Sequence, residues 1–269
     1  MSHLYLTTSM MASYEVIKLF IKDKTKRFMN LQHSSPYMMR VKDSVRLSSP
    51  ECDEVVVKLD LEPMQGHVLE PFVAGKVARL GLPGLKEPMP SYFAIASEPG
   101  CTDYYEFVIK QRPGIANLLA QLEPGASVEV DGPMGKGFDL SSFHGCNVYL
   151  IGVGTGIAPL RSVWRDMLSH RDDYGDIAIY AGFLTPCHRL LTDELESLAE
   201  HNIEVSVSVK TGSDAWEGPI GYVQDTLKAA APAGENAVAC LAGMNAMVDA
   251  CQETLQNLGF NDSQILLNY

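Results

Sequence analysis

The segment from residue 147 to residue 160 constrains the fold more than any other part of the sequence. An apolar run, Val-Tyr-Leu-Ile, leads into the glycines at positions 152, 154 and 156, and a helical pattern follows with Pro159 near its first turn. Such a turn exposes N–H groups at a helix N-terminus, where aligned peptide dipoles favour a phosphate, and a Cβ would block a nucleotide's approach. By itself the loop also fits a purely structural turn between strand and helix.

The same alternation of strand, turn and helix patterns continues to the C-terminus. It predicts a five-stranded parallel sheet built from βαβ units. Strands are expected at 148–152, 177–181, 203–209, 237–242 and 264–269, and helices at about 159–170, 190–201, 221–230 and 245–258.

The preceding part of the chain has short β-branched or alternating runs separated by turns rich in proline and glycine. We expect strands at 39–42, 55–61, 105–110 and 127–130, and one short helix near 115–122. An antiparallel β-barrel is the natural interpretation. The predicted organisation is an N-terminal extension (1–37), a barrel domain (38–145) and an α/β domain (146–269), since a chain of 269 residues favours two domains.

Charge and composition exclude several classes of function. The net charge of −12 disfavours binding to nucleic acid or to an anionic membrane surface. With no run of about 18 or more apolar residues and no secretion signal, we expect no membrane insertion and a cytoplasmic protein, or a stromal one in a plastid-bearing source. The Lys-rich first 37 residues fit a frayed extension, an upstream start, a targeting peptide or a basic docking arm.

The six cysteines are scattered without a C-x-x-C pair. The sequence therefore signals neither a zinc site nor an iron–sulfur cluster, and we expect no metal and buried, reduced thiols.

Four ordered motifs resemble the ferredoxin–NADP reductase superfamily. Residues 154–162, Gly-Thr-Gly-Ile-Ala-Pro-Leu-Arg-Ser, are similar to its pyridine-nucleotide loop, and residues 131–138 to the G-P-x-G-x-G-F segment of the hydrogenase and dihydroorotate dehydrogenase electron-transfer branch. Residues 218–223 are similar to G-x-x-G-Y-V, and residues 242–247 to C-G-x-x-x-M with Ala242 at the first position. With its ending at 265–269, the pattern looks closest to plant plastid reductase-like proteins.

The resemblance implies a flavoprotein that takes hydride from NAD(P)H onto bound FAD rather than FMN. Electrons would then pass to an acceptor such as a ferredoxin or a partner subunit. The rival hypothesis is a redox-inactive interaction module that kept the fold but lost tight flavin binding. A subunit role of the dihydroorotate dehydrogenase type is disfavoured, because no C-terminal cysteine cluster is present for a [2Fe–2S] centre.

The sequence departs from the family at the flavin segment Arg-x-Tyr-Ser, which here reads Ser91-Tyr92-Phe93-Ala94. Phe93 supplies either an aromatic face for the flavin or a plain core ring. Ser91 lacks the guanidinium that meets phosphate, and Ala94 lacks the hydroxyl near flavin N5, so hydride transfer is slower or a backbone group serves N5. Arg112 and the amides of 115–117 offer a substitute phosphate site, with a solvated surface charge as the alternative.

Three residues are candidates near the reacting centre: Tyr269, Ala94 and Cys240. Tyr269 is either an aromatic that stacks on the flavin until nicotinamide displaces it, or a residue that simply packs at the end of a strand. Cys240 is either a catalytic substitute or a packed thiol. Leu184 replaces a family arginine. Arg189 and Lys210 are each either a partner for a 2′-phosphate or an exposed charge, so NADH and NADPH stay open. The implied cofactor-binding residues are Ser91, Phe93, Ala94, Ile95, Ala96, Val108, Ile109, Lys110, Arg112, Gly114, Ile115, Ala116, Asn117, Gly154, Thr155, Gly156, Pro159, Gly243, Met244, Met247 and Tyr269.

Overall fold

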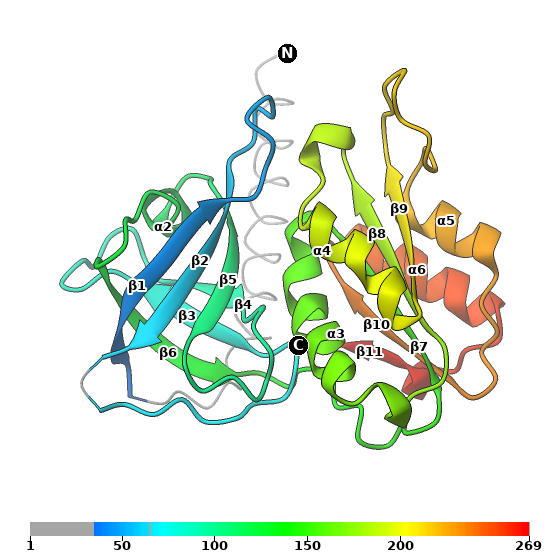
Figure 1. The fold of residues 1–269 in the computed structure, drawn as a ribbon, viewed down its shortest axis with the longest axis horizontal. Helices are drawn as coiled ribbons and strands as arrows, with labels where there is room; N and C mark the ends of the chain where they lie inside the picture. Colours follow the sequence, from blue (N-terminus) through cyan, green and yellow to red (C-terminus); the bar gives the residue numbers. More distant parts are fainter. Residues whose placement is uncertain (1–34, 65, 269) are drawn as a thin grey trace, which may run out of the picture.

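The chain folds into a β-barrel that lies beside a parallel sheet covered by helices (Figure 1). The computed structural model describes residues 35–64 and 66–268. Almost all of the predicted extension (1–37) and the terminal Tyr269 therefore lie outside the described residues.

The barrel is a six-stranded antiparallel sheet in the order β4-β3-β6-β1-β2-β5. A bridge between Ile95 and Phe107 joins its two edges, and the barrel is thereby closed. A short helix, α2 (Ile115–Leu119), packs against the barrel core. The strands are β1 (Tyr37–Arg46), β2 (Val56–Pro63), β3 (Val77–Gly81), β4 (Ser91–Ala94), β5 (Tyr105–Lys110) and β6 (Ser127–Met134).

Successive side chains of β5 point to opposite faces, as in any strand. Tyr105, Phe107 and Ile109 belong to the barrel core. Glu106 and Val108 point the other way, yet both are buried, because the second domain covers them. Strand β5 is therefore the wall that the two halves of the molecule share.

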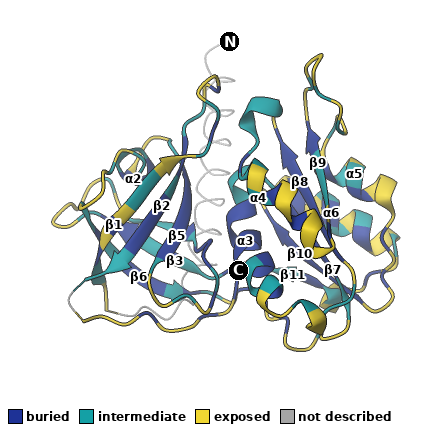
Figure 2. Cartoon of the chain, viewed as in Figure 1, coloured by how far each residue is buried: buried dark blue, intermediate teal, exposed yellow. Residues whose placement is uncertain are grey.

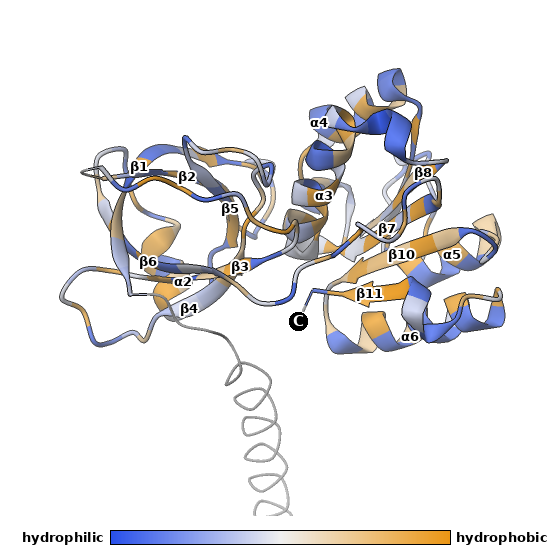
Figure 3. Ribbon diagram, turned by 90° about the horizontal axis from the view of Figure 1, so that it is seen from below, coloured by the Kyte–Doolittle hydropathy of each residue, from blue (hydrophilic) through white to orange (hydrophobic). Residues whose placement is uncertain are grey.

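The second sheet is parallel throughout, in the order β11-β10-β7-β8-β9. Helices α3 (Ile157–Ser169) and α4 (Thr192–Ser197) pack on one face, and α5 (Val223–Ala230) and α6 (Asn245–Asn257) on the other. Figure 3 shows apolar strands between helices whose outer faces are hydrophilic. The strands are β7 (Asn147–Val153), β8 (Ile177–Phe183), β9 (Ile203–Val209), β10 (Ala237–Ala242) and β11 (Ile265–Leu267).

The predicted fold class is confirmed, and the differences are local. Strands β3 and β4 carry no clear alternation and were not expected from the sequence. The expected helix at 190–201 is α4 followed by a 3₁₀ turn over Leu198–His201. The helix expected from 221 begins at Val223, where the Asp225 carboxylate accepts a hydrogen bond from the Tyr222 amide at 3.0 Å. The predicted boundary at residue 145 stays a prediction.

A buried ion pair joins the barrel to the parallel sheet domain. Arg161, on α3, is 5% exposed, and its Nη1 donates to the Glu106 carboxylate and, at 3.3 Å, to the Ala96 carbonyl. Its Nε also donates to Glu194, at 2.7 Å to Oε2. Figure 2 shows α3, with many buried residues, between the barrel and the sheet. Burial raises the pKa of the Glu106 carboxyl, and the Arg161 guanidinium opposes that shift.

Within the described residues, the structure has no helix that combines the length and the apolar character required to cross a membrane.

We expect Arg161→Met to lower the free energy of unfolding by about 3–5 kcal/mol, because it leaves the Glu106 carboxylate buried without its partner. The matched control is Arg165→Met, since Arg165 also contacts Glu106, at 3.5 Å, but is 32% exposed. That control should cost about 1 kcal/mol or less. Urea unfolding followed by circular dichroism measures both, and equal costs for the two variants would contradict the assignment.

Candidate functional site

A cavity of about 350 Å³ lies where the carboxyl ends of the parallel strands face the barrel. Ligands of open α/β sheets bind at this edge, because loops diverge there and helix N-termini point toward it. The barrel contributes Ser48, Cys52, Glu54, Val56, Lys110 and Arg112, and the α/β domain contributes Val153, Gly154, Thr155, Gly182, Phe183, Leu184, His188, Leu190, Lys210, Gly221, Tyr222, Val223 and Met244.

The glycine loop forms one wall of this cavity. Residues Gly154–Gly156 make a 3₁₀ turn that runs directly into α3, and no side chain caps the helix. A Cβ on Gly156 would lie 2.5 Å from the Ala242 carbonyl oxygen, so only glycine lets this loop rest against the end of β10. The loop after β7 and the 242–247 motif, which lie about 90 residues apart in the sequence, are thereby held together.

The cavity is cationic although the chain is acidic. Its lining includes Lys110, Arg112 and Lys210 against a single carboxylate, Glu54, which pairs with Lys110. Lys210 follows β9 directly, and its Nζ lies 5.5 Å from the ring centre of Tyr222. In a chain of net charge −12, this excess of positive charge favours an anionic ligand.

Of the residues implied by the family resemblance, the cavity brings together Lys110, Arg112, Gly154, Thr155 and Met244. Other residues that the resemblance implies do not line the cavity. Val108 and Ile109 belong to the buried wall of β5, Ile95 and Ala96 are fully buried, and Pro159 lies in the first turn of α3.

The flavin segment on β4 has Phe93 in the position of a core ring, one of its two expected roles. Phe93 pairs with Ala78 across the sheet and packs into the barrel core, with 9% of its surface exposed. In this arrangement its ring offers no open face for stacking. Ala94, which has the opposite orientation, packs against the cluster shared with the α/β domain, and Ser91 is half-buried.

Cys240, a candidate either for a catalytic substitute or for a packed thiol, has the surroundings of a packed thiol. It is fully buried in the middle of the sheet, between Leu150 and Leu266 on the neighbouring strands, and it does not line the cavity. The family position itself, Ala242, ends β10. Beyond it Met244 is exposed and lines the cavity, whereas Met247, on α6, is buried in the cluster between the sheet and helices α5 and α6.

The helix that begins with Ile115 is shorter than predicted. It has five residues, Gly114 precedes it with a φ of 103°, and Ile115 and Ala116 are buried in the barrel core. Asn117 accepts a hydrogen bond from Gln111 at 3.0 Å. Arg112 is exposed and is the member of this segment that reaches the cavity.

Sequence reasoning missed several residues that line the cavity, among them Glu54, His188 and Tyr222. Tyr222 had a signal, because it lies within the motif at 218–223. Glu54 had no such signal, whereas His188 lies in the segment 182–189, which resembles the family's G-A-R-T-P loop, although that resemblance gave His188 no role. Of the two cations weighed for a 2′-phosphate, Lys210 lines the cavity, whereas the Arg189 guanidinium lies over the Trp216 ring at 5.2 Å.

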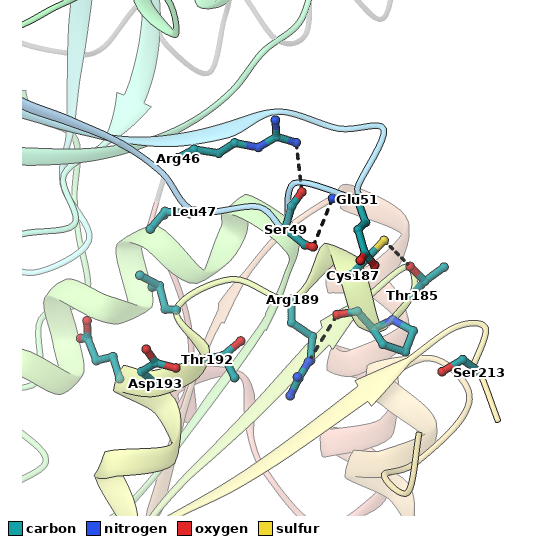
Figure 4. Close-up of a pocket in the computed structure, with 14 residues that line it drawn as sticks. Arg46, Leu47, Ser49, Glu51, Thr185, Cys187, Arg189, Thr192, Asp193 and Ser213 are labelled. Carbon is teal, nitrogen blue, oxygen red and sulfur yellow. Dashed lines mark hydrogen bonds between the residues drawn. The ribbon is translucent and has the colours of Figure 1, made fainter. Parts of the chain in front are cut away.

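A second and larger cavity, of about 990 Å³, also lies between the barrel and the α/β domain. Its lining combines Arg46, Ser49 and Glu51 of the barrel with the segment from Thr185 to Glu194 (Figure 4). The Arg46 guanidinium lies over the loop that carries Ser49, and Cys187 faces the same loop from the other side.

Comparison with known proteins agrees with this architecture. A family model described as the oxidoreductase NAD-binding domain matches residues 150–253. The gamma subunit of sulfhydrogenase 1 from Pyrococcus furiosus is 29% identical over 200 residues, which cover 73% of this chain and 67% of the relative. The reductase component of propane 2-monooxygenase from Mycolicibacterium goodii is 30% identical over 222 residues, which cover 77% of this chain and 60% of that protein.

Solved structures share the fold over nearly the whole described chain. A ferredoxin NADP+ reductase from Neisseria gonorrhoeae, with bound FAD and NADP, superposes with a TM-score of 0.72 at 18% identity and covers 87% of this chain and 98% of its own. The fold is thus a barrel beside an α/β unit that resembles the NAD-binding domain of oxidoreductases. These likenesses support the resemblance to the ferredoxin–NADP reductase superfamily that its motifs predicted.

We expect Gly156→Ala to lower the free energy of unfolding by about 1–3 kcal/mol, because the added Cβ overlaps the Ala242 carbonyl and forces the loop away from β10. Gly100→Ala is the control, since a Cβ there meets nothing within 4 Å. Thermal unfolding of both variants checks this. A Gly156→Ala protein as stable as the control would show that the loop does not depend on this close contact.

Proposed function

We propose that this chain is an NAD(P)H-dependent flavoprotein reductase. The observation that carries the proposal is the cationic cavity at the carboxyl ends of the parallel strands, directly opposite the barrel. A dinucleotide brings two negatively charged phosphates, which the glycine loop and the cations Arg112 and Lys210 suit. The match of residues 150–253 to an oxidoreductase NAD-binding domain supports the same choice of ligand.

The residues present fit a flavin in part. Arg112 supplies an exposed side chain on the cavity, and Lys110, the last residue of β5, lines the same cavity. Phe93 is packed in the barrel core, and Ser91 and Ala94 lack the groups that the family uses. When bound, the flavin accepts hydride and releases electrons one at a time.

In this proposal each residue has a physical task. Arg112 holds a diphosphate by charge-assisted hydrogen bonds, and Glu54 orients the Lys110 ammonium beside it. The glycine loop at 154–156 places backbone amides against the nucleotide's phosphates. Ala94 offers no hydroxyl near N5, so a backbone group takes that position. Tyr269, outside the described residues, stays a candidate for stacking on the flavin.

The electron acceptor and the compartment are proposals as well. We infer that a ferredoxin-like protein or a partner subunit receives the electrons, because relatives are named as ferredoxin and cytochrome b5 reductases. A cytoplasmic or stromal location is the corresponding expectation.

A second candidate function is the interaction module that has lost tight flavin binding. The observation that favours it is the burial of Phe93 together with the serine at position 91. In that case the cavity would bind a pyridine nucleotide without any redox chemistry.

Anaerobic titration separates the two functions. The purified chain, reconstituted with FAD and freed of excess cofactor, should be yellow, and the absorbance of oxidised flavin should fall on addition of NADH or NADPH. Titrating the two nucleotides separately reveals which is preferred. A colourless chain that still binds a nucleotide would support the interaction module and reject the reductase.

Arg112→Ala should weaken FAD binding roughly tenfold to a hundredfold, since a hydrogen bond to a charged group contributes about 1.5–3 kcal/mol. Lys228→Ala removes an exposed cation on α5, away from the cavity, and serves as the matched control. Equilibrium dialysis against FAD gives both dissociation constants. Unchanged affinity in Arg112→Ala would place the diphosphate elsewhere.

A further inference from the structure

Two thiols and an imidazole meet where the barrel contacts the α/β domain. Cys52 lies in the loop between β1 and β2, whereas Cys187 and His188 lie in the 3₁₀ turn that follows β8. The two Sγ atoms and a ring nitrogen all lie within 4.8 Å of one another. The three residues form a cluster only in the folded chain, since 134 residues separate the two cysteines.

The imidazole of His188 is buried in an unusual state. Its side chain is 11% exposed, and its Nε2 is buried and makes no hydrogen bond. Nε2 lies 3.4 Å from Asp53 Oδ1, but without hydrogen-bond geometry. Nδ1 lies 2.7 Å from Thr185 Oγ1. A buried ring nitrogen without a partner is costly, and a metal-bound histidine uses one nitrogen for the metal while the other is hydrogen-bonded.

The loop that carries Cys52 is held in place by its own chain. Arg46 Nη2 donates to the carbonyls of Ser49 and Cys52 at 3.0 and 3.1 Å, and its Nε donates to the Ser48 carbonyl at 3.1 Å. Figure 4 shows the first of these bonds, together with Cys187 and its contact to Thr185. Cys52, itself 6% exposed, is thus fixed in position.

We propose that Cys52, Cys187 and His188 form a binding site for Zn²⁺, which ties the two domains together. Two thiolates and an imidazole select zinc among the common divalent ions, and each thiol releases its proton on binding. The Asp53 carboxylate, whose Oδ1 lies 3.9 Å from Cys52 Sγ, is the fourth ligand.

The separations in the cluster suit a metal. Ligand atoms around tetrahedral zinc lie roughly 3.3–3.8 Å apart, because Zn–S and Zn–N bonds are about 2.3 and 2.0 Å. The two Sγ atoms and a ring nitrogen of His188 lie within 4.8 Å of one another, so a small inward shift brings them to these separations, and His188 Nε2 lies 3.4 Å from Asp53 Oδ1. A disulfide would instead require an S–S distance of about 2 Å and an oxidant, and all six cysteines are free thiols.

The proposed site borders the nucleotide cavity, which Cys52 and His188 also line. It does not depend on the flavin, because its ligands are side chains of this chain alone. The absence of a C-x-x-C pair gave no sign of it, since its ligands come from two loops of different domains.

Cobalt titration of the full, reduced chain after treatment with a chelator tests the site. We expect one equivalent of Co²⁺ to produce a thiolate-to-cobalt charge-transfer band, which Zn²⁺ then abolishes by displacement. Cys52→Ser and Cys187→Ser should lose the band, and Cys101→Ser, a half-buried cysteine outside the cluster, should keep it. Thr185→Val, which removes the partner of Nδ1, should weaken Co²⁺ binding roughly 10-fold.

Circular dichroism of each variant confirms that it is folded, and His188→Ala gives an independent removal of a ligand. The proposal is overturned if the wild-type chain shows no such band, or if the band survives in Cys52→Ser or Cys187→Ser. It is also overturned if the reduced chain takes up no Co²⁺ and peptide mapping of the air-exposed chain finds Cys52 joined to Cys187.

Discussion

The buried ion pair between Arg161 and Glu106 sets the relation between the two domains, and the candidate site depends on that relation. Arg161 lies on α3, which directly follows the glycine loop. Glu106 lies on β5, which ends at Lys110 shortly before Arg112. A buried charge pair adds little to stability by itself, because desolvation offsets much of the attraction. Its effect is on the arrangement of the domains, since a movement that separates the two charges leaves Arg161 with Glu194 alone and Glu106 with only the longer contact to Arg165. The ion pair therefore helps to fix the position of the barrel side of the cavity relative to the α/β side.

The alternation of β5 explains how one strand serves both domains. Its aromatic and aliphatic residues at 105, 107 and 109 complete the barrel core, while Glu106 and Val108 face α3 and its surroundings. A strand of an isolated barrel would expose the second set. In this chain both faces of β5 are buried. Its sequence is therefore apolar at nearly every position, with Glu106 as the carboxylate among them.

Much of the architecture followed from local patterns in the sequence. The glycine loop, the parallel strands and the barrel were predictable, because period-two runs and glycine turns act within a few residues. Strands β3 and β4 were missed, since they are short and are defined by their partners across the sheet. The inward orientation of Phe93 was not determined by spacing, because a shift of one residue in a strand exchanges its faces. The contacts of Cys52 with Cys187 and His188 depend on the docking of the domains, which no local pattern specifies.

The chain is acidic overall but its cavity is cationic, so the charges close to a bound ligand matter more for its binding than the net charge. At physiological ionic strength charges farther apart than about 8 Å are largely screened, so the net charge of −12 does not prevent an anionic ligand from approaching. Inside the cavity Lys210 and Arg112 act on a ligand at short range and with less screening, whereas the Glu54 carboxylate is paired with the Lys110 ammonium. For a protein partner the balance is different, because a large interface covers the acidic surface as well. Charge therefore favours a small anionic donor at the cavity and works against an acidic protein acceptor over most of the remaining surface.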